Sequence, residues 1–82
     1  MKVPRNLSSD TLIQLLTRFG YIVTRQTGSH IRLTTQDNGQ HHITIPAHDP
    51  LKIGTLNSIL RNVAEHFGLT KDELLEKMFA ES

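Results

Sequence analysis

A histidine follows a Gly-Ser step in the stretch TRQTGSHIRL, residues 24–33. The unperturbed pKa of histidine, about 6.5, lets its ring both accept and donate a proton near neutral pH. His30 is the acid–base candidate that the pattern places on an exposed, basic surface. Gly28 lets another backbone come close, and Ser29 adds a hydroxyl. Such a histidine on its own is more often structural or solvated than catalytic, so its neighbours must decide.

The cations near this histidine are suited to a polyanion. Arg25, Arg32 and Lys52 can each pair with a phosphate. In RNA the 2′-hydroxyl attacks the neighbouring phosphorus, so an enzyme need not supply a nucleophile or a metal ion. It needs a group that moves the proton, worth typically about 10²–10⁴-fold in rate, and donors for the charge on the phosphoryl oxygens. His30 and the cations favour RNA cleavage without a cofactor, and DNA should survive.

Other catalytic patterns are missing from the sequence. It has no cysteine, Gly-rich phosphate loop, serine with a paired base, or close carboxylate pair. Among its five histidines, His41, His42 and His48 lie close in sequence. Adjacent strand residues point to opposite faces, and nothing completes a ligand set, so we expect solvated histidines and no metal site. His66, late in a predicted helix, complements the helix dipole.

The elements that position His30 begin with a helix and a sheet. Apolar residues at helical spacing predict a helix over residues 9–19, started by Ser8, Ser9 or Asp10 and ended by Gly20. YIVTRQ, residues 21–26, is rich in β-branched and aromatic residues and predicts a first strand. Residues 31–35 and 41–45 flank QDNGQ, and an Asn-Gly pair between alternating runs predicts an antiparallel hairpin.

Alternation along these two strands predicts one apolar and one polar face. The apolar face carries Ile31, Leu33, Ile43 and Ile45. The polar face carries His30, Arg32, Thr34, His42 and Thr44. His42 is the nearest candidate for a second proton-transfer group, provided that the strand register brings it beside His30. Arg32 would otherwise stabilise the developing charge.

Two helices are predicted after Pro46, which ends the third strand. Thr55 can cap the first of them, and Gly68 closes it. Its apolar stripe is Leu56, Ile59, Leu60, Val63 and Phe67. TKDE at residues 70–73 is a capping box that starts a last helix, whose buried face is Leu74, Leu75, Met78 and Phe79. The order is α-β-β-β-α-α, an α+β fold with a three-stranded antiparallel sheet and helices packed on one face.

Length and charge set wider limits. The 82 residues predict one domain, 1–82. The sequence has no run of about 20 apolar residues and no signal peptide, so we expect a soluble, cytoplasmic protein and no membrane partner. Residues 1–61 carry seven Lys or Arg against three Asp, whereas residues 62–82 carry two Lys against five acidic residues. The basic part is suited to a polyanion, and the acidic part should face away from it.

Four stretches, TGSHIRL, HHITIPAH, LKIGTLNSIL and GLTKDELLE, resemble the HicA toxins of bacterial and archaeal toxin–antitoxin pairs, also called YcfA-like proteins. The likeness runs from about Leu7 to Met78. Its most specific parts are Gly28-Ser29-His30 and residues 45–60.

The resemblance implies a fold similar to a double-stranded RNA-binding domain and the role of a type II toxin. It implies an mRNA interferase, a ribosome-independent endoribonuclease that stops translation and growth. The family's catalytic histidine corresponds to His30, and the glycine before the Ser-His step corresponds to Gly28. The partners would be mRNA and a HicB-type antitoxin that covers this histidine. Gly54 to Ser58 hold no lysine cluster, so strong duplex binding is not expected.

Two alternatives come from other functional classes. A non-catalytic RNA-binding module would use the same basic sheet face, with Arg25, Arg32 and Lys52 on phosphates. A protein-interaction domain would use the acidic last helix instead.

Overall fold

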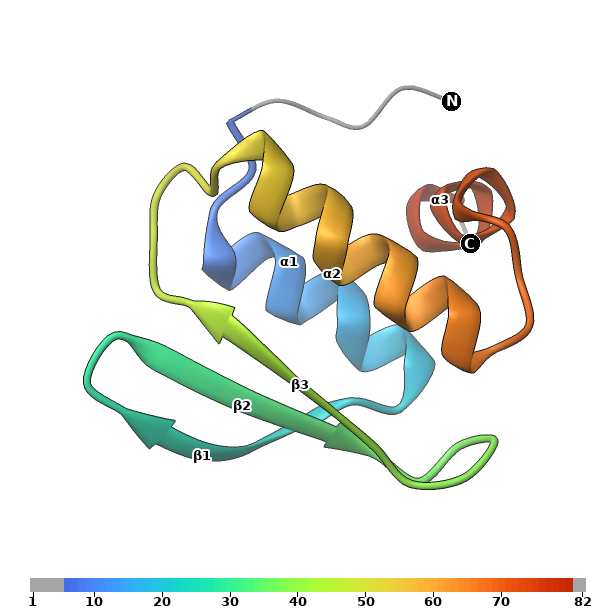
Figure 1. Ribbon diagram of the computed structural model, residues 1–82, viewed down its shortest axis with the longest axis horizontal. Coiled ribbons are helices and arrows are strands. Elements are labelled where there is room, and N and C mark those ends of the chain that lie inside the picture. Colours follow the sequence, from blue (N-terminus) through green and yellow to red (C-terminus); the bar gives the residue numbers. More distant parts are fainter. Residues whose placement is uncertain (1–5, 81–82) are drawn as a thin grey trace.

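The computed structural model describes residues 6–80, so Lys2, Arg5 and Glu81 of the charge count and both ends of the predicted domain lie outside the described residues. A first helix leads into three strands and two further helices (Figure 1). The elements are α1 (Ser9–Leu16), the short 3-10 helix η1 (Thr17–Phe19), β1 (Ile22–Thr27), β2 (His30–Thr35), β3 (His41–Pro46), α2 (Ile53–His66) and α3 (Lys71–Phe79). This order confirms the predicted α+β fold.

The sheet is antiparallel in the order β1-β2-β3, and its apolar face packs against the helices. Ile31 pairs with Ile45 and Leu33 with Ile43, and all four side chains are buried as predicted. α1 and α2 lie over this face, whereas α3 packs against α1 and α2 (Figure 1). The helices contribute Leu12, Leu16, Leu56, Ile59, Leu60, Val63, Ala64, Leu74, Leu75 and Met78 to the core.

The chain before β1 differs slightly from the prediction. The α-helix ends at Leu16, and residues 17–19 continue as 3-10 helix, which commonly tightens a last helical turn. Gly20 then adopts a left-handed φ of 82°, as expected of a helix stop. Tyr21 is fully buried and precedes the strand, which begins at Ile22.

The start of α2 contradicts the predicted cap. The helix begins at Ile53 with Lys52 in the N-cap position, so Thr55 lies inside its first turn. Leu51 is buried, and its N–H donates to the carbonyl of Leu7 at 2.8 Å, which fixes the chain immediately before the helix. A lysine side chain has no acceptor for the free N–H groups, so the sequence carries no capping signal here.

The last helix begins as predicted and is tied down at both ends. Thr70 Oγ1 accepts from the N–H of Glu73 at 3.1 Å, and Glu73 Oε1 accepts from the N–H of Thr70 at 2.9 Å. At the other end, Arg18 Nη1 donates to the carbonyl of Met78 at 2.9 Å. The acidic α3 therefore lies in the helical layer, away from the outer face of the sheet (Figure 1). None of the helices within residues 6–80 is long and apolar enough to cross a membrane.

Candidate functional site

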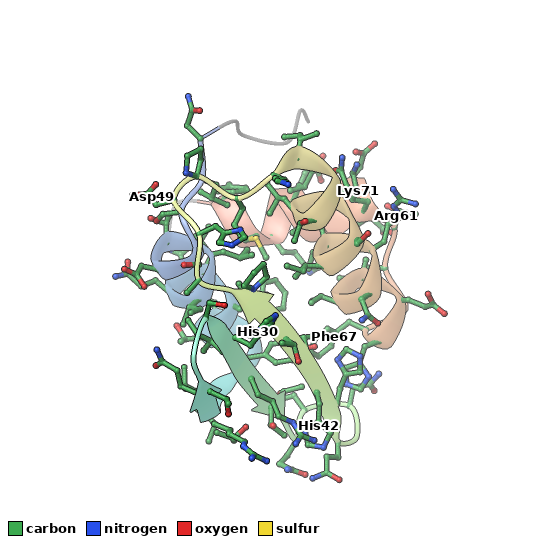
Figure 2. The ribbon with its side chains drawn as sticks, turned by 60° about the vertical axis from the view of Figure 1, so that its left-hand side comes forward. His30, His42, Asp49, Arg61, Phe67 and Lys71 are labelled. Carbon is green, nitrogen blue, oxygen red and sulfur yellow. The ribbon has the colours of Figure 1, made fainter. Side chains whose placement is uncertain are left out.

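The outer face of the sheet is free of helices, and its side chains form three rows across the strands. Directly opposed residues share a face, so the register defines the rows. They are Thr27–His30–Pro46, Arg25–Arg32–Thr44 and Ile22–Thr34–His42, and we call this surface the open face. Successive rows are two residues apart on β2, about 6.8 Å. His30 and His42 therefore lie toward opposite ends of the sheet (Figure 2).

His30 is the first residue of β2 and follows a two-residue turn. Gly28 in this turn has a φ of 55°, the left-handed value that the first position of a type II′ hairpin turn requires. Beyond the turn, the N–H of Ala47 donates to the carbonyl of Ser29 at 2.6 Å, which fixes the backbone beside His30. The exposed ring of His30 has no hydrogen bond, ion pair or ring contact within residues 6–80. It is free to exchange protons with a bound ligand.

Arg25 and Arg32 lie directly opposite each other in the middle row. Both side chains are exposed, and neither forms an ion pair with a carboxylate in the described part of the chain. Like charges in directly opposed positions destabilise a sheet. An anion between the two guanidinium groups would remove this repulsion, and phosphate oxygens fit the donor geometry of arginine.

His42 occupies the third row, and the structure corrects its predicted role. Its register partner is Thr34, four residues along β2 from His30, which puts the backbones of the two histidines about 14 Å apart. The register therefore does not bring His42 beside His30 as a second proton-transfer group. Thr34 was predicted to be an open polar residue, but it is only 6% exposed. Its hydroxyl lies between two neighbouring side chains, 2.9 Å from Thr24 Oγ1 and 2.7 Å from His42 Nδ1.

The other predicted site residues divide into two groups. Gly28 and Ser29 form the turn next to His30, and no atom lies within 4 Å of the position that a Cβ on Gly28 would take. A ligand backbone can therefore approach this turn closely. Lys52, in contrast, is exposed at the N-terminus of α2, in the helical layer. It does not belong to the open face that carries Arg25 and Arg32.

A second group of rings, which sequence reasoning did not bring together, lies on the helical side of β3. His41 Nδ1 is 2.7 Å from the Tyr21 hydroxyl, and its ring stacks on His66 with centroids 4.4 Å apart. Burial, followed by the charge of His66, lowers the pKa of His41, and burial raises the pKa of Tyr21 to about 12. His66 Nε2–H donates to the carbonyl of Asp37 at 2.9 Å. His41 and His42 thus point to opposite sides of β3, as expected.

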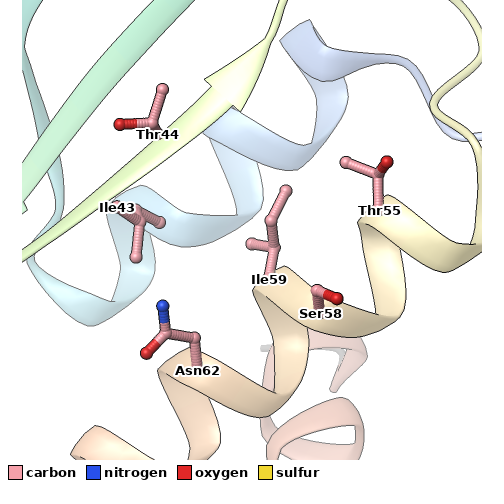
Figure 3. A pocket seen from close by; sticks show the side chains of 6 residues that line it. All are labelled: Ile43, Thr44, Thr55, Ser58, Ile59 and Asn62. Carbon is pink, nitrogen blue, oxygen red and sulfur yellow. The ribbon is translucent and has the colours of Figure 1, made fainter.

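Two cavities lie along the side of α2 that faces β3. The first, about 360 Å³, is lined by His41, Asn62, Glu65 and His66. The second, about 320 Å³, is lined by Ile43, Thr44, Thr55, Ser58, Ile59 and Asn62 (Figure 3). Neither is lined by His30 or the two arginines, although Thr44 of the open face lines the second. Within residues 6–80, no three His, Asp or Glu side chains are grouped so that they could hold a metal ion.

Comparison with known proteins identifies the family. No match was found among curated proteins or among solved structures. A family model described as the HicA toxin of bacterial toxin–antitoxin systems matches residues 9–64. The matched segment covers more than half of the chain and includes all three strands and every residue of the open face. The chain therefore belongs to the HicA toxin family.

Proposed function

We propose that this toxin is an mRNA interferase, an endoribonuclease that cleaves messages without the ribosome and without a metal ion. The observation that carries the proposal is the unpartnered ring of His30, one row away from Arg25 and Arg32, which lie in opposed positions on β1 and β2. A proton-transfer group beside two unpaired cations is what cleavage by the RNA 2′-hydroxyl needs. Membership of a toxin family supports the proposal, because loss of mRNA stops growth.

In the proposed reaction, the 2′-oxygen attacks the adjacent phosphorus while a ring nitrogen of His30 accepts the 2′-hydroxyl proton. The bond from phosphorus to the 5′-oxygen of the next nucleotide breaks, and that oxygen takes up a proton from water, while His30 later releases the proton that it accepted to the solvent. The products are a 2′,3′-cyclic phosphate and a 5′-hydroxyl. Arg25 and Arg32, one row away, bind the neighbouring backbone phosphate, and their positive charge stabilises the negative charge that builds on the scissile phosphoryl oxygens. Gly28 and Ser29 leave room for the RNA backbone beside the ring.

The proposed protein partner is a HicB-type antitoxin. A toxin of a toxin–antitoxin pair needs an inhibitor, and family membership supports this one. The open face is exposed and basic, so an antitoxin that covered it would shield His30 and both arginines together. We therefore expect the complex to be inactive toward RNA.

The test is cleavage of a labelled mRNA by the purified protein, with EDTA present and ribosomes absent. The wild type should cleave, and His30→Ala should lose at least about 10²-fold in rate, the lower end for one acid–base group. The variant should fold normally, because the ring is exposed and makes no hydrogen bond, ion pair or ring contact in the described residues. Retained cleavage by a folded His30→Ala protein would disprove the assignment.

Product chemistry separates this proposal from the non-catalytic RNA-binding module. Mass spectrometry of a cut oligonucleotide should find a cyclic or 3′-phosphate, and a substrate with a 2′-deoxy sugar at the cut position should stay intact. Salt-dependent binding by a protein that leaves RNA whole after long incubation would favour the binding module, which the exposed Arg25–Arg32 pair also supports.

A further inference from the structure

A directed chain of hydrogen bonds leads to the end of the open face opposite His30. Thr24 Oγ1 lies 3.4 Å from the carbonyl oxygen of Arg32 and 2.9 Å from Thr34 Oγ1, which is 2.7 Å from His42 Nδ1. A carbonyl oxygen only accepts, and each hydroxyl donates one hydrogen. All three bonds can form together only if Thr24 donates to Arg32, Thr34 donates to Thr24, and the Nδ1–H of His42 donates to Thr34.

This direction determines what His42 offers to a ligand. With its hydrogen on Nδ1, the neutral ring has a lone pair on Nε2, and this nitrogen has no partner within residues 6–80. Protonation turns Nε2 into a cationic donor and leaves the bond from Nδ1 to Thr34 intact. The anchor is well protected, because Thr34 is only 6% exposed whereas His42 is exposed. His30 has no such anchor, so the two exposed histidines of this face have different chemistry.

The three rows also match the geometry of an extended strand. His30, the Arg25–Arg32 pair and His42 follow one another along the open face in steps of about 6.8 Å. The spacing of successive phosphates in an extended, single-stranded RNA is similar. A duplex would present its phosphates along a curved groove instead of along successive rows of one sheet face.

We propose that His42, through Nε2 of its protonated ring, binds a backbone phosphate of single-stranded RNA two phosphates away from the one at His30. This rests on the proposed function, because it places the scissile phosphate at His30. A phosphate oxygen is an acceptor, so Nε2 must carry a hydrogen, and binding takes up a proton. Positive charge on Arg32 in the adjacent row and on His41 on the other side of β3 disfavours a positive charge on His42. The negative charge of the phosphate offsets this repulsion. The uncharged Thr34 lies beside it in the same row, and the uncharged Thr44 lies in the adjacent row.

The experiment measures binding of an uncleaved single-stranded RNA to the His30→Ala protein between pH 7.5 and 5.5. The variant removes both cleavage and the other exposed histidine of the open face. Affinity should increase as the pH falls, by up to about tenfold per pH unit for one proton taken up. Adding His42→Gln should remove this increase. The matched control is His48→Gln, which changes an exposed histidine outside the three rows and should leave the increase in place.

Imidazole ¹⁵N spectra of the free protein give a second, RNA-independent readout. At pH 8 the neutral His42 ring should carry its hydrogen on Nδ1, and Thr34→Val should remove this preference. A hydrogen on Nε2, or equal pH dependence with and without His42, would overturn the proposal while leaving His30-dependent cleavage standing. Absence of RNA binding at every pH would overturn both this proposal and the proposed function.

Discussion

Arg25 and Arg32 show how two residues can be arranged to bind a ligand at a cost to the stability of the free protein. The two positive charges lie opposite each other and have no carboxylate partner in the described residues. The stability of the sheet therefore gains nothing from having both. Such an arrangement is reasonable if the two guanidinium groups act on a phosphate. The same reasoning separates their effect on RNA binding from their effect on stability.

We predict opposite effects of Arg25→Gln or Arg32→Gln on binding and on stability. Each should lower the slope of log affinity against log salt concentration by about 0.7, the value for one phosphate contact on a single strand. Each should leave the melting temperature unchanged or raise it, because the cross-strand repulsion is relieved. The measurements are RNA binding at several salt concentrations, in a His30→Ala background, and thermal unfolding.

The control for these variants is Arg61→Gln. Arg61 is an exposed cation on α2, in the helical layer and away from the open face (Figure 2). The Arg61→Gln protein loses the same charge as the other two variants, but it should keep the full slope of log affinity against log salt concentration. An equal loss of slope in all three variants would mean that net charge, and not the arginine pair, attracts the RNA.

A local pattern was sufficient to predict the glycine turn before His30, because turn chemistry depends on a few adjacent residues. Lys52 was assigned to the phosphate-binding surface on charge alone, but the start of α2 places it in the helical layer. The role of His42 depended on the register between β2 and β3, which pairs it with Thr34 and which alternation alone does not specify.

At the scale of elements, the β2–β3 hairpin is attached to the C-terminal end of α2. Asn38 Nδ2 donates to the carbonyl of His66 at 2.8 Å, and His66 Nε2–H donates back to the carbonyl of Asp37 at 2.9 Å. The stacked ring of His41 lies against this junction. Because burial and the charge of His66 disfavour a charged His41 ring, this attachment should weaken in acid.

We predict that His41 makes the protein less stable as the pH falls. Its pKa is lowered in the folded state, chiefly by burial, so between the lowered and the ordinary value the unfolded chain binds more protons. The contribution of the neutral His41 ring to the stability of the folded protein is fully present above the ordinary pKa. It is lost as the pH falls from about 6.5 toward the lowered pKa. Glu65 and Asn62 line the same cavity as His41 and His66.

The measurement is the urea midpoint of unfolding at pH 7.5, 6.5 and 5.5 for the wild type and His41→Asn. The substitution keeps a polar side chain but removes this titration, so its midpoint should change less with pH. The comparison isolates His41, because the other histidines are common to both proteins. Identical pH dependence of the two proteins would show that His41 carries no part of the effect.

The two helix starts show what sequence can say about elements. Thr70 and Glu73 form the predicted capping box because both partners lie within one helical turn. Thr55 is a favourable N-cap residue type without a capping box, but the buried Leu51 and its bond to Leu7 fix the chain earlier, so α2 begins before it. A tertiary contact between segments more than 40 residues apart decided this boundary, and no local pattern contains that information.

At the scale of the whole molecule, the fold separates the charges that the sequence only divides by position. The sheet exposes the arginines on its outer face, and the acidic α3 packs on the far side of the helical layer (Figure 1). Alternation and helical periodicity were sufficient to predict this layered arrangement, because each element has one apolar face that must be buried. RNA approaching the open face therefore meets cations and is kept away from the carboxylates of α3.

We predict that RNA binds on the sheet and not on the helices. In amide NMR spectra of the His30→Ala protein, single-stranded RNA should shift signals from residues 24–32 and 42–44, whereas Glu76 and Lys77 on α3 should not move. The start of α2 holds no lysine cluster after Lys52, so it lacks the charge that duplex recognition through that helix would need. Shifts confined to α2 would therefore refute binding at the open face, and a preference for duplex RNA would place the phosphates on the helices. Shifts that follow the three rows, and that weaken when Arg32 is replaced, would show that this toxin uses its sheet to bind RNA.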